Sequence, residues 1–135
     1  MLGEKIGEYQ GKITGQRVLP SDGPGPKVET SFQVSGTILE IESTILGTYW
    51  AVVRPDGTLH GEGQGVTMTQ DGDMASFTGS GVGTFTGRGS GIAYRGAIYY
   101  QTASPKLARL NRIAAVFEWD VDENGNAIGN IWEWK

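Results

Sequence analysis

The sequence contains no cysteine and only one histidine, His60. The absence of cysteine excludes disulfides, thiolate metal sites and a cysteine nucleophile. A single histidine excludes a metal site built from several imidazoles within one chain. Most common enzyme chemistries therefore lose their usual side chains, and we expect neither a metal nor another cofactor.

The chain also lacks a cluster of basic residues and a long apolar run. Eleven Lys and Arg against fifteen Asp and Glu give a net charge of −4, which argues against a nucleic-acid partner or an anionic membrane surface. The longest apolar runs are about five residues, too short to span a membrane. The first residues lack the apolar stretch of a signal peptide, so a cytoplasmic protein is expected. At 135 residues, we expect one domain over 1–135.

What the sequence has in excess is glycine, with 22 residues but no three-residue period and only five prolines, so it is not collagen-like. Period-2 alternation recurs between turn signals and predicts an all-β protein. The fold that we expect is an eight-stranded antiparallel up-and-down β-barrel of the calycin type, with a two-sheet sandwich as the alternative. The expected strands are 5–19, 28–38, 44–54, 58–70, 74–86, 90–102, 112–123 and 127–134. A rigid loop is expected at 20–26 and a helical turn at 104–111.

Turn chemistry predicts the strand registers, which decide which side chains meet. The segment 54–58 suits a type I turn followed by a glycine bulge, and it places Trp50 opposite Glu62, Val52 opposite His60 and Thr48 opposite Gln64. A two-residue Asp71-Gly72 turn would pair Met68 with Ala75 and Glu62 with Gly81. These two registers predict an inward face with Val52, Trp50, Val66, Met68, Phe77, Phe85, His60, Glu62 and Gln64. They predict an outward face with Thr67, Thr69, Ser76, Thr78, Ser80, Thr84 and Thr86.

The segment Asn124-Gly125 is a type I′ turn signal that predicts an aromatic inner face for the last hairpin. It would pair Val121 with Ile128, Trp119 with Asn130, Phe117 with Trp132 and Ala115 with Trp134. Alternation in 92–100 turns Tyr94 and Tyr100 inward as well. The glycines Gly79, Gly81 and Gly83 would also face inward and leave room, which either the aromatic rings or a ligand would fill.

Three polar residues, His60, Glu62 and Gln64, lie on one face of an expected strand, with neighbours about 7 Å apart. A desolvated carboxylate beside an imidazole could transfer protons, so Glu62 and His60 are the candidate catalytic pair. The alternative places His60 in water at the barrel mouth and Glu62 in an ion pair. Asn130, expected to face inward, could orient a ligand. The candidate ligand-binding residues are Trp50, Gln64, Phe77, Tyr94, Tyr100, Trp119, Asn130 and Trp132.

The stretch 48–58 (TYWAVVRPDGT), followed by the glycine-rich strands around 77–85 (FTGSGVGTF), resembles the allene oxide cyclase-like barrel group. This group includes dirigent proteins, spirotetronate-type cyclases and small bacterial proteins. The resemblance covers roughly residues 44–102. It implies an eight-stranded barrel, often oligomeric, whose cavity holds apolar molecules and whose cyclases shape their substrates. No catalytic motif of the cyclases matches this chain residue by residue.

Three functions follow from this interpretation. The first is binding of a small, largely apolar molecule in the barrel. The second is a cyclase, isomerase or lyase that uses Glu62 and His60. The third is a structural protein with a filled core, which forms homo-oligomers through Tyr49, Tyr99 and its threonine-rich outer face.

Overall fold

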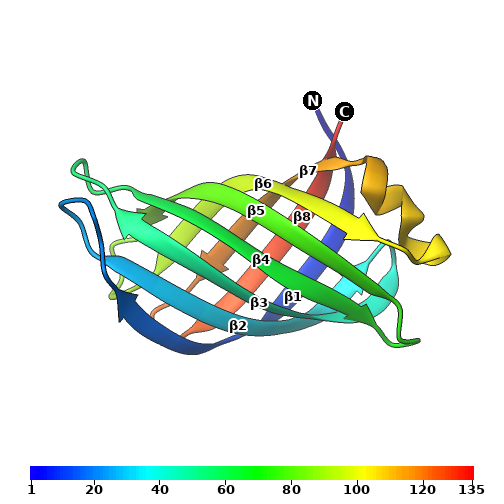
Figure 1. Ribbon diagram of the computed structural model, residues 1–135, viewed down its shortest axis with the longest axis horizontal. Coiled ribbons are helices and arrows are strands. Elements are labelled where there is room, and N and C mark those ends of the chain that lie inside the picture. Colours follow the sequence, from blue (N-terminus) through cyan, green and yellow to red (C-terminus); the bar gives the residue numbers. More distant parts are fainter.

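A computed structural model describes residues 1–135, and it shows a closed barrel of eight antiparallel strands in sequence order (Figure 1). This confirms the predicted fold over the sandwich. The strands are β1 (Leu2–Leu19), β2 (Lys27–Ile38), β3 (Ile41–Val53), β4 (Leu59–Thr69), β5 (Met74–Phe85), β6 (Ile92–Thr102), β7 (Ala114–Val121) and β8 (Asn126–Trp134). Pairing of β8 with β1 closes the barrel and leaves no open sheet edge.

The two ends of the barrel differ. At one end, the 3₁₀-helix η1 (Pro105–Arg112) connects β6 to β7, so we call this the helix end (Figure 1). Leu107 and Leu110 of η1 are fully buried and close this end. The opposite end, the loop end, carries the connections after β1, β3, β5 and β7. No helix is long and apolar enough to cross a membrane.

Three hairpins share one turn type, a three-residue turn whose last residue is a glycine at positive φ. In the first, Arg54 donates its backbone N–H to Thr58 O, and Gly57 has φ +87°. The β4–β5 and β7–β8 hairpins repeat this pattern with Gly72 at φ +90° and Gly125 at φ +79°. This is a type I turn followed by a glycine bulge, which matches the right-handed twist of the strands. The prediction for 54–58 is therefore confirmed.

The other two predicted registers are wrong, because both turns contain three residues where we expected two. Met68 pairs with Met74 instead of Ala75, and Glu62 pairs with Ser80 instead of Gly81. In the last hairpin, Trp119 pairs with Gly129 instead of Asn130, and Phe117 pairs with Ile131 instead of Trp132. Side chains alternate along a strand, so a one-residue slip exchanges the two faces.

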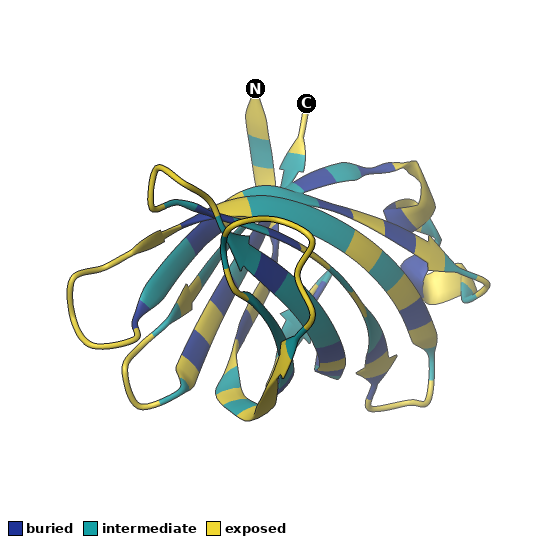
Figure 2. Ribbon diagram, turned by 60° about the vertical axis from the view of Figure 1, so that its left-hand side comes forward, coloured by how far each residue is buried: buried dark blue, intermediate teal, exposed yellow.

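The register between β3 and β4 is confirmed, including Trp50 opposite Glu62, but the face that we assigned to the interior is the outer one. The interior instead receives the alternate set, which includes Tyr49, Ala51 and Leu59. Thr67 and Thr69, expected in solvent, are also buried. Figure 2 shows this alternation as bands of buried and exposed residues along the strands. A hairpin register fixes which residues are neighbours, but not which of the two faces turns inward.

A two-residue turn does occur, between β2 and β3, where no glycine signals it in the sequence. Leu39 and Glu40 both have positive φ, at 50° and 66°, and Ile38 pairs directly with Ile41. Such backbone geometry is uncommon outside glycine, asparagine and aspartate. As a result, β3 begins at Ile41 and not at residue 44 as expected.

Candidate ligand-binding cavity

Large rings in the barrel lie against glycines on neighbouring strands. Phe77 is paired with Gly65, and Tyr94 with Gly83. A Cβ at Gly65 would overlap the Phe77 ring, and one at Gly83 would lie 2.6 Å from Tyr94. Phe32 covers Gly47 in the same way. Part of the glycine excess therefore serves to accommodate rings.

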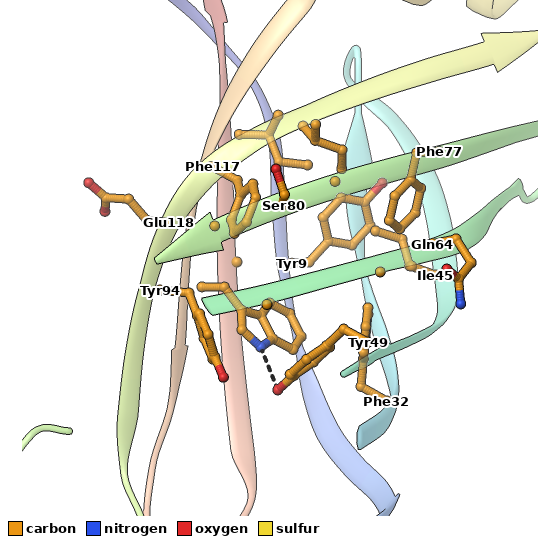
Figure 3. A pocket seen from close by; sticks show the side chains of 18 of the residues that line it. Tyr9, Phe32, Ile45, Tyr49, Gln64, Phe77, Ser80, Tyr94, Phe117 and Glu118 are labelled. Atoms are coloured by element: carbon orange, nitrogen blue, oxygen red, sulfur yellow. Dashed lines mark hydrogen bonds between the residues drawn. The ribbon is translucent and has the colours of Figure 1, made fainter. Parts of the chain in front are cut away.

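Between these rings the barrel retains a cavity of about 110 Å³ (Figure 3). Gly61, Gly63, Gly79 and Gly81 form a wall on β4 and β5 that has no side chains. The inward side chains around the cavity are those of Tyr9, Phe32, Val34, Ile45, Tyr49, Phe77, Tyr94, Ile98, Phe117, Trp119 and Ile131. The interior is therefore neither fully filled by rings nor a wide channel.

Four rings from β2, β3, β6 and β7 form a layer on the loop side of the cavity. Phe32 lies 4.6 Å from Trp119 and 5.9 Å from Tyr49, between ring centroids. Tyr49 lies 5.7 Å from Tyr94 in an edge-to-face arrangement, which is favourable for aromatic pairs. The indole N–H of Trp119 donates to the Tyr49 hydroxyl at 3.2 Å (Figure 3). This hydrogen bond fixes both rings across the barrel.

Hydroxyl groups lie toward the helix end. The Tyr9 hydroxyl and Ser43 Oγ are hydrogen-bonded at 2.6 Å and buried. Tyr100 and Thr67 have buried hydroxyls without a partner. Burial raises the pKa of Tyr9 to about 12, and it also raises the pKa values of Tyr100 and Tyr94. These phenols are thus uncharged at neutral pH.

The cavity is electrically neutral. Glu62 and Glu118 are the charged residues that border it, and their side chains are 53% and 44% exposed. Figure 3 shows Glu118 pointing away from the cavity. Burying an unpaired charge is costly, so this interior favours an uncharged occupant over an ionic one.

Five of the eight predicted binding residues line the cavity: Phe77, Tyr94 and Trp119 with inward side chains, and Gln64 and Asn130 from outward positions, as does the predicted catalytic Glu62. Tyr100 also faces inward, next to Phe77 at 5.7 Å between ring centroids, but it lies behind the cavity wall. The predictions for β5, β6 and β7 are correct about direction because the inward positions of these strands carry rings that alternate with polar residues.

The predicted inward direction is wrong for Trp50, His60, Glu62, Gln64, Asn130 and Trp132, which lie at the outward positions of β3, β4 and β8. His60 and Glu62 are 3.8 Å apart and half exposed, so they form a surface ion pair when His60 is charged. The Trp50 ring carries Lys27 Nζ at 4.4 Å, and Trp132 carries Lys5 Nζ at 5.9 Å. The lysines explain how two tryptophans are accommodated on the surface. Gln64 donates to Thr48 O on the neighbouring strand.

Sequence reasoning missed Tyr9, Phe32 and Tyr49 as cavity residues. Tyr9 and Phe32 lie on β1 and β2, whose connecting loop carries no turn signal that fixes a register. Tyr49 was expected on the outer face. It faces inward because side chains alternate along β3, and the face that carries Trp50 is the outer one. The alternation of apolar residues in 28–38 was the available signal for Phe32.

The structure contains no group of three or more His, Asp or Glu side chains that could hold a metal ion. The remaining chemistry of the cavity is apolar contact, aromatic packing and hydrogen bonding by hydroxyls.

Comparison with known proteins supports the fold. No family model matches the chain, and no curated protein matches it. Among solved structures, a conserved protein of unknown function from Rhodopseudomonas palustris is similar with a TM-score of 0.82 at 13% identity, covering 98% of this chain and 97% of that one. A protein with unknown function from Clostridium acetobutylicum is similar at 0.82 and 15% identity, covering 96% of each chain. A beta-barrel like protein from Acinetobacter baumannii has a TM-score of 0.82 and 15% identity, with coverages of 100% and 96%.

Proposed function

We propose that this protein binds a small, uncharged, largely apolar molecule inside the barrel. The observation that carries the proposal is the cavity of about 110 Å³, lined by rings and bare glycine backbone with no charge directed into it. An apolar cavity of about 150 Å³ binds benzene in another protein. The volume here therefore suits a ligand of about one small ring.

The resemblance to the allene oxide cyclase-like barrels agrees with this proposal, because that group is characterised by cavities for apolar molecules. We include a relationship to that group in the proposal. The enzymatic alternative has less support, since Glu62 and His60 are half exposed on the outer face. The filled-core alternative is disfavoured by the cavity and by the inward position of Tyr49, although Tyr99 remains exposed.

Filling the cavity tests the proposal. A Cβ at Gly61 would lie 3.5 Å from the Tyr94 ring, so Gly61→Val places methyl groups beside it in the cavity. We expect toluene, followed by NMR through the Trp119 indole N–H, to bind the wild type and to bind Gly61→Val at least about tenfold more weakly. Gly15→Ala is the control, because a Cβ there has nothing within 4 Å.

Equal toluene binding by Gly61→Val and the wild type would show that toluene does not occupy this cavity. Chemical-shift changes confined to outer residues such as Trp50 would lead to the same conclusion. A folded spectrum of Gly61→Val is required for the comparison, and Gly61→Ala, with a smaller side chain, provides it if the valine variant does not fold.

A further inference from the structure

The outer faces of β3, β4 and β5 carry a group of apolar side chains near the helix end. Leu46, Met68 and Met74 are 57%, 45% and 53% exposed, although all three are large and apolar. Val66 pairs with Leu46, and Met68, two residues further along the same face, pairs with Met74. Side chains in such positions are in contact range. We call these four residues the apolar patch, because a contiguous exposed group of this kind marks a surface that contacts another molecule.

The strands that carry the apolar patch have few charged residues. On β3, β4 and β5 the acidic residues are Glu42 and Glu62, and none of the three strands contains a lysine or an arginine. These strands lie side by side in the barrel wall (Figure 1). By contrast, the single strand β1 carries five charged residues, Glu4, Lys5, Glu8, Lys12 and Arg17. Charge is therefore distributed unevenly around the barrel.

Uncharged polar side chains surround the apolar patch. Thr44 pairs with Met68, Ser76 pairs with Val66, and Gln64 precedes Val66 by two residues. An apolar centre that contains methionine, within a polar surround that lacks Lys, Glu and Asp, has the composition typical of a protein–protein interface. Methionine suits such a surface, because its flexible side chain adapts to whatever packs against it.

We propose that the apolar patch is the contact between two copies of this chain related by a two-fold axis. In a two-fold contact the same surface meets itself, so any charge near the axis faces a like charge. A patch without charge avoids this repulsion. Nucleic acid and anionic membranes require cationic side chains, and β3–β5 supply no lysine or arginine. The contact lies outside the barrel, so this inference goes beyond the proposed function and does not depend on it.

The extent of the uncharged face indicates how strong the dimer should be. Strands lie about 4.8 Å apart and outward residues about 6.8 Å apart along a strand, so each outward residue covers about 33 Å². About a dozen uncharged outward positions on β3–β6 thus provide about 400 Å² of flat area per copy, and side-chain relief adds to it. Stable interfaces bury about 1,200 Å² or more in total, and weak ones bury less. We therefore expect a dimer that dissociates on dilution.

Sedimentation velocity of the whole chain, at concentrations from about 1 to 200 µM, tests the proposal. The wild type should shift from monomer to dimer across this range. Its dissociation constant should change less than about twofold with salt, because the apolar patch carries no charge. Met68→Lys should weaken the dimer at least about tenfold, because two like charges would meet in the contact. Ile128→Lys is the matched control and should keep the wild-type constant, since Ile128 is 53% exposed on the outer face of β8.

The other outcomes contradict the proposal. A wild type that remains monomeric at the highest concentration would show that this face does not bind a second copy and is left for a different protein. A dimer that Ile128→Lys dissociates and Met68→Lys does not would place the contact on the other side of the barrel. Leu46→Lys repeats the test at a second position of the apolar patch if Met68→Lys does not fold. Toluene binding is measured separately, so failure of this inference leaves the proposed function in place.

Discussion

Tyr9 combines two properties that are hard to satisfy together, because its ring lines an apolar cavity and its hydroxyl is buried. The hydrogen bond to Ser43 offsets part of the cost of burial, and burial itself raises its pKa to about 12 from the ordinary value of 10.0. The rings of Phe77 and Tyr94 solve a simpler problem, since the bare glycines opposite them provide the space. The environment of each of these residues is thus set by residues on neighbouring strands, one strand away for Phe77 and Tyr94 and two strands away for Tyr9.

The raised pKa of Tyr9 predicts that stability falls at alkaline pH. Below pH 10 the phenol is protonated in both states, so stability does not depend on its titration. Between pH 10 and 12 the unfolded chain loses this proton while the folded protein keeps it, which favours unfolding as pH rises. Each such tyrosine contributes a slope of about 1.4 kcal/mol per pH unit.

In Tyr9→Phe the free energy of unfolding should therefore fall less steeply with rising pH than in the wild type. Urea denaturation at a series of pH values between 9.5 and about 11.5 measures this slope. Tyr99→Phe is the matched control on the exposed surface and should retain the wild-type slope. An identical slope in Tyr9→Phe would mean that the Tyr9 phenol already titrates normally in the folded protein.

At the level of elements, the hairpins determine which residues share a face. The sequence predicted the existence and approximate bounds of all eight strands, because alternation and turn residues are local signals. It failed at Gly72 and Gly125, since Asp-Gly and Asn-Gly suit both a two-residue turn and a three-residue turn with a glycine bulge. It also failed at Trp50, where a correct register left the choice of face open.

The last hairpin offers a direct test of its turn type. Gly125 has positive φ, whereas Asn124 does not, and Asp122 accepts hydrogen bonds from the backbone N–H groups of Asn124 and Asn126. Gly125→Ala should destabilise the protein by about 1–2 kcal/mol, because an L side chain is strained there. Asn124→Ala should cost less than about 0.5 kcal/mol, since its side chain has no structural role in this turn.

Chemical denaturation midpoints of these two variants distinguish the turn types. In a type I′ turn both residues would need positive φ, so comparable losses from Asn124→Ala and Gly125→Ala would contradict the three-residue turn.

For the whole molecule, the sequence predicted a barrel because short connections and alternation admit few other closed arrangements. The candidate site was only partly predictable, since Phe77, Tyr94 and Trp119 belong to strands with clear alternation. Gly79 and Gly81 of the bare wall were predicted to face inward and leave room, and they do line the cavity. Tyr9, Phe32 and Gly61 could not be assigned, because a cavity depends on how all eight strands close. The shared fold of three proteins at 13–15% identity shows that this architecture tolerates extensive sequence change.

The cavity has a consequence for how the protein responds to hydrostatic pressure. Internal space such as this cavity of about 110 Å³ adds to the volume decrease on unfolding, which is on the order of 20–100 mL/mol for proteins in general. Compression should therefore unfold the protein at constant temperature, and tryptophan fluorescence under pressure would measure the midpoint. Saturation with toluene, or the Gly61→Val substitution, should raise that midpoint, because a filled barrel has less volume to lose. Pressure is thus expected to act on this protein through the cavity at the centre of the barrel.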